Sequence, residues 1–287
     1  MQEAAAATAA IASASAEPDA ELTYRLRQQI RYEYDEPVRD VHQRLVVVPP
    51  AEHGPQWRTE WDLAVDGADV TRRRTSTDRF GNTVADVDLA RVEESVTFTV
   101  TSTVVKAMTA DPHVARWRRA HLASTRLTQP GDAIAALADE AKRAADPGAA
   151  LCRLVHGALQ YEWGVTDVST TAAEALQVGR GVCQDYAHVM LAGCRSLGVA
   201  ARYVSGHLLG EGGSHAWVEV LHPDPSARGR WLVEGWDPTH DARTGARHVT
   251  IAVGRDYADV APMSGTYDGL GVGNRLSVVK TLTPSVP

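Results

Sequence analysis

The chain has 287 residues, of which 44% are hydrophobic and 23% are charged, and its formal net charge is −7. This length is enough for one large domain or two medium ones with a sizeable core, and the composition is ordinary for a globular protein. The acidic balance gives no support to a general role at nucleic acids or membrane surfaces, so neither is expected as a partner.

Residues 1–20 are predicted to be a disordered tail. They are rich in Ala, with Ser and acidic residues, and they lack the basic start and strong apolar stretch of a signal peptide. The chain also has no run of about 18 apolar residues, so no transmembrane helix is expected. These features together predict a cytoplasmic protein.

Residues 21–107 are predicted to form a β-sandwich-like domain. Side chains suited to one buried face recur at every second position in several segments, for example Trp57, Thr59, Trp61, Leu63 and Val65. This period of two is typical of strands with one buried face. The pairs Asp66-Gly67 and Gly81-Asn82 are turn signals between such strands. An antiparallel, all-β domain follows.

The remaining residues, 108–287, are predicted to form an α+β domain. A connection without a clean period leads to two Ala- and Leu-rich stretches with helical spacing, at 131–145 and 148–160. After Gly179 and Gly181, a further helix is expected from Cys183 to Leu197, ended by Gly198. Strands are expected after it, at 199–206, 215–221, 231–236, 249–253 and 275–282.

Cys183 is the first candidate for chemistry because it opens this helix. A helix N-terminus presents unpaired N–H groups and a partial positive charge, which favour a thiolate and can stabilise an oxyanion. His188 lies five residues on, about 140° around the helix, so it cannot serve as the base. A structural pairing of His188 with Asp185 is expected instead.

His215 and Asp237 are the candidates for the base and its partner. His215 begins one predicted strand, and Asp237 directly follows the next one. If the hairpin between them is symmetric about Ser226, the two side chains lie directly opposite each other. A carboxylate in that place orients an imidazole and stabilises its charged form. The inference depends on register, because a slip of one residue would put the side chains on opposite faces.

Three segments carry a resemblance to a known family: GRGVCQDYAHVMLAGCRSLGVAARYVSG, SHAWVEV and WLVEGWDPTH. They resemble the core motifs of bacterial transglutaminase-like proteins, which use a Cys-His-Asp triad on a papain-like fold. The triad of the family falls on Cys183, His215 and Asp237. DRFGNTV at 78–84 resembles the β domain that precedes this core, and VGRDYADVAPMSGTY at 253–267 resembles the closing segment.

The resemblance implies an α+β papain-like core, with a central helix packed on an antiparallel sheet, preceded by an all-β domain. It also suggests partners for the oxyanion beside the backbone N–H of Cys183. Gln177 has the offset of the oxyanion glutamine in papain-like proteases, and Trp163 resembles the upstream tryptophan of animal transglutaminases. The family's closing segment suggests that Arg255, Asp256 and Tyr257 line the cleft.

The expected activity is acyl transfer through a thioester on a protein or peptide substrate. Water as acceptor would make the protein a protease or amidase, and an amine would make it a transglutaminase. No cofactor and no metal requirement are expected, because the chain has no D-x-[DN]-x-[DN]-G calcium loop.

Two other functions are compatible with parts of this pattern. The first is a non-catalytic binding scaffold that retains the fold, which the presence of all three triad residues disfavours. The second is a metal site built from Cys183, His188, His207 and His215. Their spacing matches no tight ligand motif, so this site is also disfavoured.

Overall fold

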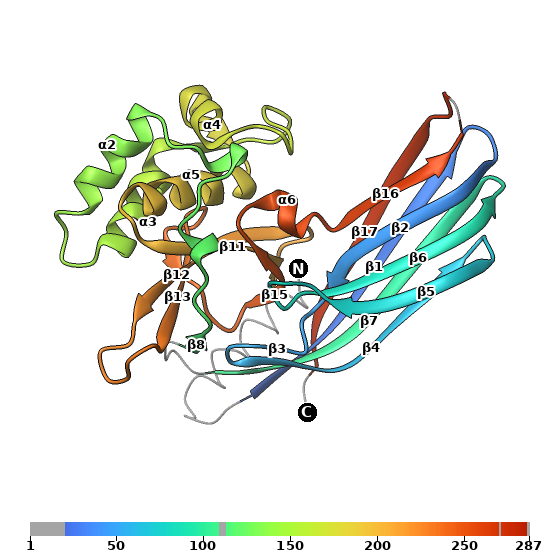
Figure 1. Ribbon diagram of the computed structural model, residues 1–287, viewed down its shortest axis with the longest axis horizontal. Coiled ribbons are helices and arrows are strands. Elements are labelled where there is room, and N and C mark those ends of the chain that lie inside the picture. The colour runs from blue at the N-terminus through green and yellow to red at the C-terminus, as the bar shows by residue number, and fades with distance from the viewer. Residues whose placement is uncertain (1–20, 109–112, 270, 286–287) are drawn as a thin grey trace.

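The computed structural model describes residues 21–108, 113–269 and 271–285. The predicted tail at residues 1–20 lies outside the described residues. The protein has two parts, an elongated β sandwich and an α+β core that carries the helices (Figure 1). No helix of the described part has the length and apolar character needed to cross a membrane.

The sandwich consists of two antiparallel sheets. The first has the order β17-β1-β7-β4-β3 and the second has the order β16-β2-β6-β5. The strands are β1 (Glu21–Tyr34), β2 (Val38–Val48), β3 (Glu52–His53), β4 (Gln56–Asp66), β5 (Val70–Thr77), β6 (Thr83–Val92), β7 (Ser95–Ala107), β16 (Met263–Asp268) and β17 (Asn274–Ser285). The alternating apolar side chains of both sheets meet in one core, which includes Ile30, Leu45, Leu89 and Phe98.

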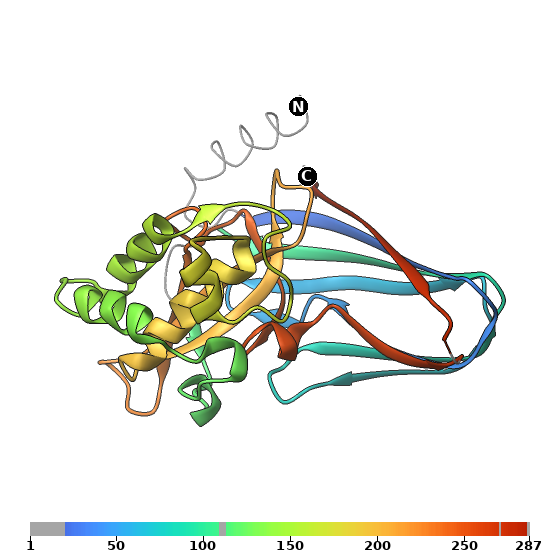
Figure 2. The same cartoon turned by 90° about the horizontal axis from the view of Figure 1, so that it is seen from above.

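The C-terminal strands complete this sandwich. Strand β17 pairs with β1 from Asn274 opposite Tyr34 to Ser285 opposite Thr23, and β16 pairs with β2. Figure 2 shows the C-terminal segment, in red, running back along the sandwich. The pairing differs from the predicted division, which left all of residues 108–287 with the core. Periodicity marks a strand but does not say which sheet edge it joins.

The core lies between β7 and β16 in the chain. Its strands are β8 (His113–Ala115), β9 (Gln160–Tyr161), β10 (Arg180–Gly181), β11 (Ala200–Leu208), β12 (His215–Pro223), β13 (Trp231–Asp237), β14 (Ala242–Arg243) and β15 (His248–Gly254). Its helical segments are η1 (Arg119–His121), η2 (Arg126–Thr128), α2 (Asp132–Ala141), α3 (Pro147–Ala158), α4 (Ala172–Val178), α5 (Cys183–Ser196) and α6 (Tyr257–Val260). The main sheet has the order β14-β13-β12-β11-β15, with β8 beside β13.

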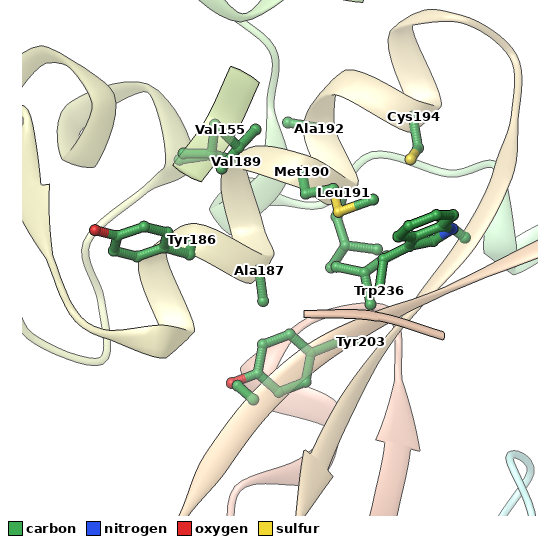
Figure 3. Packing of buried hydrophobic residues seen from close by; sticks show 14 of the residues in the cluster. Val155, Tyr186, Ala187, Val189, Met190, Leu191, Ala192, Cys194, Tyr203 and Trp236 are labelled. Carbon is green, nitrogen blue, oxygen red and sulfur yellow. The ribbon is translucent and has the colours of Figure 1, made fainter. Parts of the chain in front are cut away.

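Helix α5 is the centre of the core. All of its residues from Gln184 to Arg195 are buried, and it packs on β11 and β12 with α2, α3 and α4 around it. Figure 3 shows its apolar side chains facing Tyr203 and Trp236 of the sheet. The helix ends where expected, because Gly198 has a φ of +69°, which favours glycine. The predicted arrangement of a central helix on an antiparallel sheet is confirmed.

Candidate active site

Cys183 is the first residue of α5, and it is partly exposed at the N-terminal end of this otherwise buried helix. The turn before it is held by Asp185, whose Oδ2 accepts hydrogen bonds from the backbone N–H of Val182 at 2.8 Å and from the Thr166 hydroxyl at 2.7 Å. Gly181 leaves room for this carboxylate, because a Cβ at Gly181 would lie 2.5 Å from that oxygen. The residues around Cys183 therefore hold the turn at which α5 begins.

His215 and Asp237 lie on one face of the hairpin formed by β12 and β13. The register pairs Val218 with Trp236, and its continuation places Asp237 level with Trp217, diagonal to His215. The hairpin is thus shifted by two residues from the register expected about Ser226, in which the two would be directly opposed. A shift of two keeps both side chains on the same face, and a diagonal pair remains within reach.

The imidazole of His215 joins the carboxylate to the thiol. Its Nε2–H donates to Asp237 Oδ2 at 2.7 Å, and the ring borders the same cavity as Cys183. Because Asp237 occupies Nε2, Nδ1 is the nitrogen available to the sulfur. The three residues that the sequence singled out therefore meet at one place, although they come from α5, β12 and β13.

The charges of this group favour an ionised imidazole. Burial alone would lower the pKa of His215, but hydrogen bonds to Asp237 and Cys183 and the nearby negative charges raise this pKa to about 10. Burial raises the pKa of Asp237, yet hydrogen bonds from His215 and His248 outweigh it and hold that pKa well below its usual range. His215 is therefore protonated at neutral pH, beside an ionised carboxylate.

Two further histidines share the same carboxylate oxygen. His240 Nδ1 lies 2.9 Å and His248 Nε2 lies 3.1 Å from Asp237 Oδ2, and Oδ1 accepts the backbone N–H of Thr239 at 3.0 Å. Sequence reasoning missed both histidines. His240 ends the WLVEGWDPTH motif and could have been suspected from it, whereas His248 comes from β15 and had no local signal.

Glu211 also reaches this group from the loop between β11 and β12. Its Oε1 lies 3.1 Å from His240 Nε2, and its Oε2 lies 3.6 Å from His215 Nδ1. Glu211 was not predicted, because the loop has no periodic signal. The charged and polar side chains beside His215 are therefore two carboxylates, of Glu211 and Asp237, and two imidazoles, of His240 and His248.

A cavity of about 240 Å³ opens in front of Cys183 and His215. Its walls are largely apolar and include Trp163, Val168, Tyr203 and Tyr257. Trp163 is 73% exposed, so it stands at the rim of the cavity rather than in the core.

The other suggested cleft residues have different positions. Gln177 lies exposed on α4 and is not part of the wall of this cavity. Arg255 forms an ion pair with Asp259, and Asp256 caps α6 by accepting the backbone N–H of Ala258. Of the closing segment, Tyr257 is the predicted residue that lines the cavity.

The disfavoured metal site does not form. His188 is fully buried, and its Nε2 accepts the backbone N–H of Tyr257 at 3.2 Å rather than pairing with Asp185, which corrects the expected pairing. His207 Nδ1 contacts the carbonyl of Gly213. Where the structure describes the chain, three or more possible metal ligands gather in two other groups: His53, His113 and Glu219, and His215, Asp237 and His248.

A cysteine at the head of a buried helix, facing a histidine and an aspartate on an antiparallel hairpin, defines a papain-like class of protein. The chain matches the family described as the transglutaminase-like superfamily over residues 132–233. It also matches the bacterial transglutaminase-like N-terminal region over residues 24–105. The chain belongs to the transglutaminase-like superfamily, which confirms the resemblance.

One curated relative and one solved structure match most of the chain, and another relative matches about a third of it. An uncharacterized protein of Mycobacterium leprae is 33% identical over 245 residues, which cover 76% of this chain and 84% of that protein. An uncharacterized protein of Mycobacterium tuberculosis is 40% identical over 116 residues, 37% of this chain and 36% of that one. A solved structure described as a candidate cysteine protease from Cytophaga hutchinsonii has a TM-score of 0.66 at 19% identity. The alignment covers 92% of this chain and 98% of that one, so both share the fold of sandwich and core.

Proposed function

We propose that this protein is a thiol acyl-transfer enzyme in which Cys183 is the nucleophile, His215 the acid and base, and Asp237 the residue that orients His215. The observation that carries the proposal is the 2.7 Å hydrogen bond between the Asp237 carboxylate and the His215 imidazole, with that imidazole and Cys183 lining one cavity. A protonated imidazole beside a cysteine at a helix N-terminus favours the reactive thiolate.

The first half-reaction forms a thioester. The Cys183 thiolate attacks the carbonyl carbon of a carboxamide or peptide bond, and a carbon–sulfur bond forms. His215 then gives its proton to the departing nitrogen as the carbon–nitrogen bond breaks. The proposed donor to the oxyanion is the backbone N–H of Cys183, at the first position of α5, and Trp163 at the rim is a second candidate donor.

The second half-reaction releases the acyl group. Neutral His215 removes a proton from water, which attacks the thioester, and the products are a carboxylic acid and the restored thiolate. A primary amine attacking in the same way would give a new amide instead. The first outcome makes the protein a protease or amidase, and the second makes it a transglutaminase.

A protein or peptide is the proposed substrate. The cavity opens to solvent beside the exposed side chains of Trp163 and Val168, which offer apolar contact to a chain laid across it. A cytoplasmic location is also part of the proposal. Cell fractionation tests this part of the proposal.

Incubation with casein and with glutamine-containing peptides, each with and without a primary amine, tests the proposal. Mass spectrometry distinguishes cleavage, deamidation and amine incorporation. Cys183→Ala should abolish all three, whereas Cys152→Ala removes a buried cysteine of α3 and should keep the activity of the folded protein. Full activity in Cys183→Ala would refute the assignment.

A further inference from the structure

A second group of polar side chains lies away from the catalytic cavity, where the sandwich meets the core. It consists of His53 from β3, His113 from β8 and Glu219 from β12. One ligand atom of each lies within 4.8 Å of the other two. The group therefore draws on three separate segments: the sandwich, the connection and the central sheet of the core.

The contacts within this group are incomplete. His53 Nε2 lies 2.7 Å from Glu219 Oε1, and Arg202 Nε donates to Glu219 Oε2 at 2.6 Å. His113 Nε2, however, is buried and has no hydrogen-bond partner among the described residues. Packing holds this ring in place, because a Cβ at Gly54 would lie 2.5 Å from it. A buried nitrogen without a partner is uncommon and calls for an explanation.

We propose that His53, His113 and Glu219 form a binding site for a divalent transition-metal ion, with zinc the best fit to the ligands. Two imidazole nitrogens and one carboxylate oxygen are a set that zinc accepts, leaving a fourth position for water. A cavity of about 190 Å³ bordered by all three side chains provides room for that water. The ion would supply the partner that His113 Nε2 lacks.

The geometry needs one small adjustment. Two ligands of a tetrahedral zinc ion are separated by about 3.3 Å, so the 2.7 Å hydrogen bond between His53 and Glu219 would give way to two metal bonds. Arg202 would keep its hold on the other carboxylate oxygen, which orients a ligand from outside the site.

A second cation, Lys106, borders the same cavity, but its ammonium is directed at the backbone carbonyls of Gly245 and His248. The proposed ion would therefore lie beside Arg202, whose charge is compensated by Glu219, and beside Lys106, whose ammonium contacts other acceptors. Cys183 and His215 do not border this cavity, so the proposal does not rest on the proposed activity.

Metal titration of the full chain tests the proposal. Chelator-treated Cys183→Ala protein, which lacks the partly exposed thiol, is titrated with Zn²⁺ by calorimetry and with Co²⁺ by visible absorption. We expect one ion per chain, a tetrahedral Co²⁺ spectrum and a higher melting temperature with Zn²⁺. His113→Ala and His53→Ala should each weaken binding at least tenfold. His42→Ala, an exposed histidine of the same sandwich, should leave binding unchanged.

Circular dichroism first establishes that each variant is folded, and Glu219→Gln replaces any histidine variant that is not. Absence of binding by the parent protein would overturn the proposal. So would binding that is unchanged in His53→Ala, His113→Ala and Glu219→Gln. Binding lost in His248→Ala but retained in His113→Ala would place the ion at the His215, Asp237 and His248 group, and would also overturn it.

Discussion

Replacement of Asp237 by Asn should change the way in which Cys183 reactivity depends on pH. The hydrogen bond to Asp237 is the largest of the effects that raise the pKa of His215 from 6.5 to about 10 against the effect of burial. At about 1.4 kcal/mol per pH unit, this difference favours the imidazolium by roughly 5 kcal/mol. Without the carboxylate charge, we expect the pKa of His215 to fall by several units toward its ordinary value.

The rate of alkylation by iodoacetamide, read by mass spectrometry at Cys183, measures this change. In the wild-type protein His215 should stay charged between about pH 6 and pH 9, so its contribution to the rate should be constant over this range. In Asp237→Asn the imidazole should lose its proton within this range, so its contribution to the rate should fall as the pH rises, and at pH 8 the rate should be at least about tenfold lower than in wild type. The same loss should appear in any acyl-transfer activity, for which about 10⁴-fold is the cost in the serine-protease arrangement.

Two cysteines provide an internal control for folding. Cys152 and Cys194 are buried, and burial raises the pKa of each thiol to about 12, so neither should be labelled in a folded protein. Labelling of either one in Asp237→Asn would reveal unfolding. A variant that keeps both unlabelled and still shows the wild-type pH profile would contradict the role given to Asp237.

Three further predictions follow from the described contacts. Because the pKa of His215 is raised in the folded protein, the charged imidazole stabilises the fold fully below pH 6.5, and this stabilisation is lost as the pH approaches 10. The free energy of unfolding in urea should therefore be lower at pH 10 than at pH 7 in wild type, and the difference should be smaller in His215→Gln. Gly181→Ala brings a Cβ to 2.5 Å from Asp185, so it should lower the free energy of unfolding in urea by about 1–3 kcal/mol and slow the alkylation of Cys183. Gly212→Ala faces open space and should change neither quantity, so equal effects of the two variants would count against the steric argument. Arg202→Met leaves the buried Glu219 with His53 but without its arginine partner, and it should cost about 3–5 kcal/mol. Arg72→Met breaks an exposed pair of the same length and should cost under about 1 kcal/mol, so similar losses would show that burial is not the deciding factor.

Local patterns in the sequence predicted the elements that carry the site. Glycine and helical spacing located α5 with Cys183 at its head, and period-two alternation located the strands that begin at His215 and end at Asp237. The register between those strands was missed by two residues, because the loop from Asp224 to Arg230 is not symmetric about Ser226. The face was nevertheless correct, since an even shift preserves it.

Contacts between distant segments could not be predicted from one sequence. The position of His248 beside Asp237 depends on β15 joining the sheet next to β11, and the position of Glu211 depends on an irregular loop. The same reason applies to His53 and Glu219, which are 166 residues apart and meet only when the sandwich docks on the core. Such pairings are fixed by tertiary packing rather than by periodicity.

The pairing of β17 with β1 has a consequence for biosynthesis. During translation, β17 leaves the ribosome only after the whole core has been made. One edge of β1 therefore stays unpaired while some 240 further residues are synthesised. The core therefore has the opportunity to fold first, while the sandwich is still incomplete. A circular permutant that joins β17 directly to β1 would remove this delay, and it would show whether a nascent chain with an open edge needs a chaperone.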